Sequence, residues 1–176
     1  IMTPATNKVV PGFNVLGISP ELLAVLEKLQ FSTPTPIQHQ CIPAALEGKD
    51  IVGIAQTGTG KTLAFGVPMI QLLGQNKGQG LILLPTRELA LQVNDVLQKI
   101  GGSFGLRTAV IIGGASSYQQ IQTIRRNPHI LVSTPGRLMD HLKQRNVSLE
   151  RVKMIVLDEA DRMFDIGFAP QIKQIL

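Results

Sequence analysis

The sequence predicts an α/β fold in which a mostly parallel sheet carries helices on both faces. Short continuous apolar runs, such as residues 130–132 and 154–157, alternate with segments of helical periodicity. Such runs are typical of strands that are buried on both faces of a parallel sheet. The hydrophobic content is 44%, with no Trp and one Tyr, which fits an aliphatic interior. A chain of 176 residues is long enough for one sizeable core.

The first part of the chain predicts helices. Residues 1–12 are polar and show no periodicity, which indicates a flexible leader ahead of one domain at 13–176. Ser19 and Pro20 are placed as an N-cap and a first helical residue. A Pro-rich loop leads into a second helix at 36–46, which Gly48 is placed to end.

From residue 51 onward, strands and helices alternate. The predicted strands are residues 51–55, 81–84, 107–112, 130–133 and 152–157, and the predicted helices are residues 61–73, 88–100, 118–126, 136–144 and 170 onward. In open parallel sheets, ligands bind outside the carboxyl ends of the strands. The motifs described below each follow a predicted strand, so we expect them to converge on one edge of the sheet.

A glycine-rich loop at residues 55–62 has the composition of a phosphate-binding loop. Glycines let backbone N–H groups point at anionic oxygens, and the following helix adds its positive N-terminal end. Lys61 would reach the β- and γ-phosphates, and Thr62 would offer its hydroxyl to Mg2+. The candidate phosphate-binding residues are Thr57, Gly58, Thr59, Gly60, Lys61 and Thr62. Ala55 stands where the common motif has glycine, and a chance glycine-rich turn is the alternative.

An acidic cluster follows the apolar run that ends at Leu157. Asp158 stands at the carboxyl end of this predicted strand, where a carboxylate can hold Mg2+, usually through water. Glu159 is the candidate to orient or deprotonate an attacking water. Asp161 is expected to face another direction. The alternative is a helix N-terminus that is enriched in acidic residues because of its dipole.

The positive charge is concentrated in one segment. The net charge is +5, and residues 125–153 carry seven basic and two acidic side chains, while the rest of the chain is balanced. A basic cluster is the electrostatic footprint of a polyanionic partner. A solvated helical face explains the charge alone equally well.

In their order, these motifs resemble those of the DEAD-box RNA helicases, whose name-giving motif is similar to residues 158–161. The further resemblances are residues 31–38 to the adenine-reading Q motif, residues 85–90 to motif Ia, Gly113-Gly114 to the GG motif, and residues 134–137 to motif Ib. The resemblance covers the chain from Phe13 to its end. Gln30 departs from the family, which usually has glycine before the aromatic residue.

The resemblance implies the first RecA-like domain of an ATP-dependent RNA helicase that uses ATP and Mg2+. It implies that Lys61, Asp158 and Glu159 are catalytic and that Asp161 couples the two domains of the parent enzyme. The implied adenine-side residues are Phe13, Phe31, Thr33 and Gln38. The implied RNA-binding residues are Pro85, Thr86, Arg87, Gly113, Gly114, Thr134, Pro135, Gly136 and Arg137.

Physical arguments support several of these assignments. The amide of Gln38 can pair with both N6 and N7 of adenine. Phe31 could stack on the base, and its alternative is a core aromatic residue. At the two strand-to-helix junctions, unpaired N–H groups suit RNA phosphates, although ordinary helix capping is the alternative. Contacts to phosphates and sugars predict binding that is largely independent of sequence.

The resemblance also sets expectations for the parent protein. A Ser-Ala-Thr turn and a second RecA-like domain are expected beyond Leu176, and this domain would be a partner in cis. The isolated chain is expected to be monomeric, to bind nucleotide, and to show little or no ATPase or helicase activity. A cytoplasmic location is expected, or a nuclear one in a eukaryote, with no membrane association. The alternatives are an ATP-dependent RNA clamp and an unrelated P-loop enzyme.

Overall fold

The computed structural model describes residues 12–55 and 60–176. The chain forms two compact units, Ile1–Gln71 and Leu72–Leu176, and each is described by itself. None of the helices in the described residues combines the length and apolar character that a membrane span requires.

The described part of the first unit is helical. Its elements are η1 (Phe13–Val15), α1 (Pro20–Lys28), α2 (Pro36–Leu46) and most of α3 (Lys61–Gln75), within which the boundary between the units falls. The Oγ of Ser19 accepts a hydrogen bond from the N–H of Leu22, so the predicted N-cap is confirmed. The bounds predicted for α2 are also confirmed, and Gly48 follows it with a φ of 78°.

The side chain of Gln71 ties α3 to the segment before α1. Its Oε1 accepts from the N–H of Ser19 at 2.9 Å, and its Nε2 donates to the carbonyl of Gly17 at 3.1 Å. The core of this unit includes Phe13, Leu16, Leu22, Leu26 and Ile42, all nearly inaccessible to solvent. The two hydrogen bonds of Gln71 therefore hold the later part of α3 against the segment that precedes α1.

The strand predicted at residues 51–55 is not formed. The segment has no regular secondary structure, and the side chains of Val52 and Ile54 are 93% and 94% exposed. A strand needs a hydrogen-bonded neighbour, and the described residues of the first unit contain none. An apolar run alone therefore predicted a strand wrongly here.

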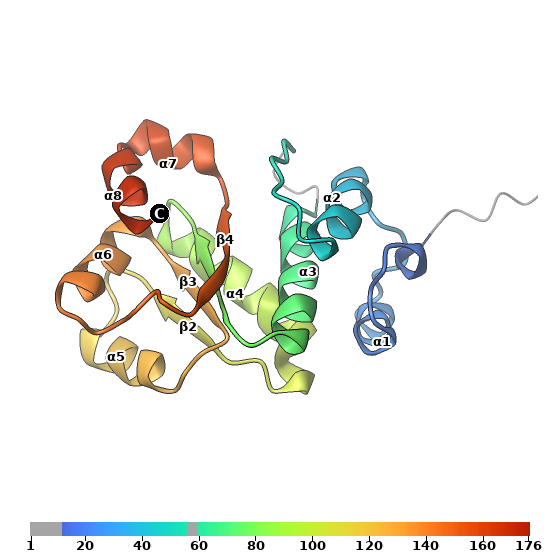
Figure 1. Ribbon diagram of the computed structural model, residues 1–176, viewed down its shortest axis with the longest axis horizontal. Coiled ribbons are helices and arrows are strands. Elements are labelled where there is room, and N and C mark those ends of the chain that lie inside the picture. The colour runs from blue at the N-terminus through green and yellow to red at the C-terminus, as the bar shows by residue number, and fades with distance from the viewer. Residues whose placement is uncertain (1–11, 56–59) are drawn as a thin grey trace, which may run out of the picture. The chain divides into compact units, whose positions relative to one another are not determined.

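The second unit is built on a parallel sheet of four strands in the order β2-β3-β1-β4 (Figure 1). The strands are β1 (Gln79–Leu83), β2 (Thr108–Ile111), β3 (Ile130–Ser133) and β4 (Val152–Leu157). The helices are α4 (Arg87–Gly101), α5 (Ser117–Arg125), α6 (Pro135–Lys143), α7 (Ala160–Ile166) and α8 (Ala169–Ile175), with a short η2 (Gly102–Phe104). The predicted parallel sheet is confirmed, and β3 and β4 have the predicted bounds.

Both faces of the central strands are covered. Leu81, Leu83 and Leu131 pack in one core cluster with residues of α6, α7 and α8. The helix α4 contacts β2 and β3, and all five residues of β1 are buried. The strand β4 lies at the end of the sheet and is more open, with Ile155 43% exposed. The helix α7 was expected only through the alternative explanation of the acidic cluster as a helix N-terminus. It begins at Ala160, and Asp161 lies in its first turn.

Candidate functional site

Four predicted motifs lie together at the carboxyl edge of the sheet, which we define as the edge where the four strands end. Because the strands are parallel, the residues that follow them share this edge. Across the edge, the order is Gly113-Gly114 after β2, residues 134–137 after β3, residues 85–87 after β1, and Asp158-Glu159 after β4. The convergence expected from the sequence is confirmed for these four motifs, whereas the phosphate-binding loop follows no strand among the described residues.

Backbone hydrogen bonds hold the starts of two motifs to the neighbouring strand. The N–H of Asp158 donates to the carbonyl of Leu83 at 3.0 Å, and the N–H of Thr134 donates to the carbonyl of Ile111 at 3.2 Å. The ladder of each strand pair therefore continues into the motif. The motifs begin on rigid backbone rather than on free loops.

The acidic motif turns sharply after β4. Glu159 has a φ of 56° in the left-handed region, and its N–H donates to Oδ1 of Asp158 at 3.1 Å. The helix α7 begins at the next residue. A non-glycine residue in this conformation is uncommon and is often found at functional sites. Asp158 and Glu159 are half-buried, whereas Asp161 is exposed.

Thr86 and Arg87 form a capped helix start beside the glycine pair. The Oγ1 of Thr86 accepts from the N–H of Leu89 at 3.3 Å and caps α4. Gly114 has a φ of 76°, and a Cβ on it would collide with the guanidinium of Arg87. Glycine at this position thus allows the arginine to lie against the backbone that follows β2. Pro85 is buried, and Gly113 is exposed.

Arg137 is held on the same loop by a polar network. Its Nε donates to Oε1 of Gln120 at 3.3 Å, and its Nη2 donates to Oγ of Ser117 at 2.5 Å and to the carbonyl of Ala115 at 3.4 Å. Thr134 and Pro135 occupy the N-cap and first-turn positions of α6, which starts one residue before the predicted helix at 136–144. The side chain of Arg137 is therefore fixed across the start of α5.

Gln120 accepts a hydrogen bond from Arg137 and also contacts His141. Neither Gln120 nor His141 was predicted from the sequence as a site residue. The amide of Gln120 donates to the carbonyl of Ile112 at 2.6 Å, and its Oε1 lies 2.9 Å from Nε2 of His141. Gln120 is 5% exposed and His141 is 2% exposed. Neither residue belongs to a recognisable motif. The one sequence feature that could have indicated them is that each is a polar residue on the buried face of its helix.

The pKa of His141 lies below its usual value. Burial is the main cause, the positive charge of Arg137 lowers the pKa further, and Asp140 opposes the shift. The imidazole is therefore held in its neutral form, which can accept at one ring nitrogen and donate at the other. Asn146 contacts Nδ1 at 3.1 Å and completes the network.

In the first unit, Gln38 links the predicted adenine loop to the phosphate loop. Its Oε1 accepts from the N–H of Thr35 at 2.9 Å, and its Nε2 donates to the carbonyl of Gly60 at 3.1 Å. Gly60 has a φ of 80°, and a Cβ there would collide with the Gln38 amide. Oγ1 of Thr35 is buried without a hydrogen-bond partner among the described residues. Glycine at 60 therefore allows the Gln38 amide to approach the backbone at the start of α3.

The other nucleotide candidates differ in exposure. Phe31 is 42% exposed, so it is not the core aromatic that was its alternative, while Phe13 is 5% exposed within the core. Lys61 and Thr62 are half-buried in the first turn of α3, and Thr33 is exposed. Thr57, Gly58 and Thr59 lie outside the described residues.

The parallel sheet with its motifs at the carboxyl edge, together with the Lys-Thr helix start, defines a RecA-like P-loop domain. The sequence profile of the DEAD/DEAH box helicase family matches residues 35–176. The chain therefore belongs to the DEAD/DEAH box helicase family.

Individual proteins agree with this assignment. The chain is 46% identical to the ATP-dependent rRNA helicase RRP3 of Debaryomyces hansenii, over all of this chain and 38% of that protein. It is 47% identical to the DEAD-box ATP-dependent RNA helicase CshA of Bacillus cereus, over 93% of this chain and 32% of that protein. The crystal structure of a DEAD box protein from Methanococcus jannaschii superposes with a TM-score of 0.88 at 41% identity, over 93% of this chain and 46% of that one. The chain thus spans less than half the length of these relatives.

Proposed function

We propose that this chain is the ATP- and RNA-binding half of an ATP-dependent RNA helicase. The parent would couple ATP binding and hydrolysis to the unwinding of RNA duplexes or the remodelling of ribonucleoproteins. The family assignment supports the reaction class, and the full-length relatives are named as ATP-dependent RNA helicases. The observation that carries the nucleotide part is the hydrogen bond between Gln38 and Gly60, because it joins the two predicted halves of the ATP site.

The residues of the first unit fit a nucleotide. The Gln38 amide uses one donor and one acceptor within the protein, and it retains one N–H and one oxygen lone pair for the adenine edge. The first turn of α3 carries Lys61 and Thr62, and N–H groups at the start of a helix favour phosphate oxygens. Phe31 is exposed and can offer its ring to the base.

Magnesium fits the donor atoms that the chain carries. The Thr62 hydroxyl and the Asp158 carboxylate are oxygen ligands of the kind that Mg2+ prefers. The bound ion would supply positive charge to the β- and γ-phosphates. Glu159 would orient or deprotonate the attacking water, and Lys61 would neutralise phosphate charge.

RNA would lie along the carboxyl edge of the sheet. Arg87 and Arg137 both lie against the loop that follows β2, and the helices α4 and α6 start at the same edge. Arginine side chains and the N–H groups of helix starts are typical contacts of phosphates. These groups recognise the RNA backbone, so the affinity should depend little on base sequence.

Nucleotide titration of the chain tests the adenine assignment. We expect ATP and ADP to bind and GTP not to compete, and we expect Gln38→Glu to remove this preference because it loses the Nε2 donor. Gln40→Glu, on the exposed side of the same helix, is the matched control and should leave the preference intact. Equal binding of GTP by the unchanged chain would show that the assignment is wrong.

Two activity measurements address the parent reaction. The isolated chain should show little ATPase activity, because an arginine finger from a second domain contributes about 10³–10⁵-fold in related enzymes. Robust RNA-stimulated hydrolysis by the 176 residues alone would contradict this expectation. A duplex-displacement assay on the full-length parent separates a helicase from an ATP-dependent RNA clamp, which grips RNA with little unwinding.

A further inference from the structure

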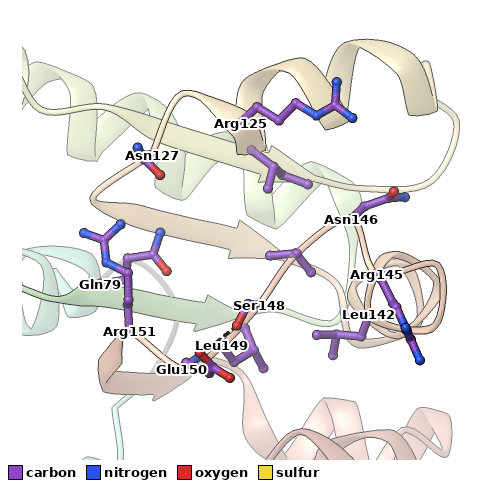
Figure 2. A pocket seen from close by; sticks show the side chains of 12 residues that line it. Gln79, Arg125, Asn127, Leu142, Arg145, Asn146, Ser148, Leu149, Glu150 and Arg151 are labelled. Carbon is purple, nitrogen blue, oxygen red and sulfur yellow. Dashed lines mark hydrogen bonds between the residues drawn. The ribbon is translucent and has the colours of Figure 1, made fainter.

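A second candidate site lies at the amino edge of the sheet, which we define as the edge where the strands of the second unit begin. A cavity of about 710 Å3 opens there, far along the strands from the motifs. Gln79 is the first residue of β1, and Arg151 directly precedes β4. Arg125 ends α5, and Arg145 follows α6 (Figure 2). The cavity therefore collects residues from β1, α5 and α6 and from the loop that precedes β4.

Three arginines surround this cavity. Figure 2 shows Arg125, Arg145 and Arg151 at three separated points around it. Within the described part of the chain, none of their guanidinium groups makes a hydrogen bond or an ion pair, and Glu150 is the one acidic side chain of the lining. Each guanidinium offers five N–H donors in a planar fork that matches a carboxylate or a phosphate.

The backbone at Arg145 also indicates a role for its side chain. Arg145 has a φ of 56°, and it ends α6 in the left-handed conformation that usually selects glycine. An arginine in this conformation has backbone strain that a glycine would avoid. The guanidinium is exposed and contributes no internal bond among the described residues, so its presence is not explained by packing.

The floor of the cavity is aliphatic. Ile124, Leu142, Val147 and Leu149 are half-buried against the core cluster, and the lining contains no aromatic residue. Single-stranded RNA is usually held by a basic groove together with aromatic side chains that stack on bases. Aliphatic side chains give a phosphodiester backbone nothing to bury, whereas they suit leucine or isoleucine side chains of a peptide.

We propose that this cavity, the arginine pocket, binds an acidic peptide segment of a partner protein that also carries aliphatic side chains. The carboxylates of the peptide pair with Arg125, Arg145 and Arg151, and its aliphatic side chains pack on the floor. The volume lies within the range of typical ligand pockets and accommodates a short segment rather than a folded surface. Clusters of arginines are a recurrent way to recognise acidic motifs.

Fluorescence anisotropy of the chain with a labelled peptide of alternating glutamate and leucine tests the proposal. We expect saturable binding, and we expect Arg145→Glu and Arg151→Glu each to weaken it by up to about fivefold, the upper end of the effect of losing one exposed charge pair. Lys77→Glu makes the same charge change on an exposed residue outside the lining and should leave the affinity unchanged. If Lys77→Glu weakened peptide binding equally, the binding would reflect general electrostatic attraction, and the proposal would be overturned.

Arg145→Gly separates binding from folding. Glycine suits the left-handed backbone, so the urea midpoint should stay or rise while the peptide affinity falls about fivefold. Unchanged affinity in this variant contradicts the proposal. A peptide of alternating glutamate and serine should bind more weakly than the leucine peptide, and equal binding would remove the role of the aliphatic floor. If oligouridylate RNA bound here and lost affinity in the arginine variants while the peptide did not, the pocket would be an RNA surface instead.

Discussion

The two edges of the sheet in the second unit hold their arginines in opposite ways. At the carboxyl edge, Arg137 is bonded to Gln120, Ser117 and the carbonyl of Ala115, and Arg87 lies against Gly114. At the amino edge, three arginine side chains surround a cavity without an internal bond among the described residues. The first arrangement fixes a few charges at defined points, and the second leaves charges available to a ligand.

This difference changes the interpretation of the net charge. Residues 125–153 carry the whole excess of positive charge, but they contribute to both edges. Arg137 is the arginine of this segment in the motif edge, whereas Arg125, Arg145 and Arg151 line the arginine pocket. A basic stretch of sequence therefore does not mark one surface, because the strand β3 and the helix α6 carry its residues from one edge of the sheet to the other and back.

The largest effect should come from the acidic motif at the carboxyl edge. Glu159→Gln in the full-length parent should lower RNA-stimulated ATP turnover about 10²–10⁴-fold, because a positioned base contributes this much to a proton transfer. Steady-state phosphate release measures the change. The matched control is Glu150→Gln at the amino edge, which should leave turnover unchanged. A similar loss of ATP turnover in both variants would contradict the assignment of catalysis to the carboxyl edge alone.

The polar network below Arg137 should give the next largest effect. Gln120→Leu leaves the carbonyl of Ile112, the Nε of Arg137 and the imidazole of His141 without their common partner. A buried polar group that loses its partner costs about 1–3 kcal/mol, so the free energy of unfolding should fall by about this amount. Urea denaturation measures it. Gln119→Leu, the exposed neighbour on α5, should cost much less, and equal costs would contradict a specific role for Gln120.

RNA affinity should distinguish the two edges more finely. Arg137→Ala should weaken the binding of single-stranded RNA about fivefold, as expected for one exposed charge pair. It should also reduce the slope of log K against log salt concentration by about 0.7, the value for one phosphate contact in a single strand. Arg151→Ala should change neither quantity. An equal loss from Arg151→Ala would place RNA at the amino edge as well.

Much of this architecture could be predicted from the sequence, for identifiable physical reasons. The strands at residues 130–133 and 152–157 contain the apolar runs 130–132 and 154–157, and their bounds were predicted to the residue. The convergence of the motifs followed from the parallel sheet alone. Residues 51–55 have the same apolar character but no neighbouring strand in the described residues of their unit, so the strand prediction was wrong there. Whether a short apolar run becomes a strand depends on a partner that the run itself does not encode.

The polar details could not be predicted from the sequence. Gln120 and His141 contact each other because α5 and α6 pack at adjacent points of the sheet. The local sequence around either residue does not predict this contact. The arginine pocket brings together Gln79 and residues more than forty positions later, so it depends on the order of the strands. Motif spacing predicted the carboxyl edge because its residues follow their strands directly. The amino edge carries no such motif.

The smallest effect should be a pH dependence that also separates the two edges. His141 supports the carboxyl edge, and His129 precedes β3 at the amino edge, where its Nδ1 accepts from the N–H of Arg107. Burial is the main cause that lowers the pKa of each below the usual 6.5. As the pH falls through 6.5, the unfolded chain binds protons first, so the stability that is present above this pH is progressively lost below it. Urea midpoints on either side of pH 6.5 should show this loss, and His141→Gln should reduce it, because a glutamine amide can still donate to Oε1 of Gln120 without titrating. A stability that rose on acidification, or a loss that remained unchanged in both His141→Gln and His129→Gln, would show that neither imidazole is held neutral by the fold.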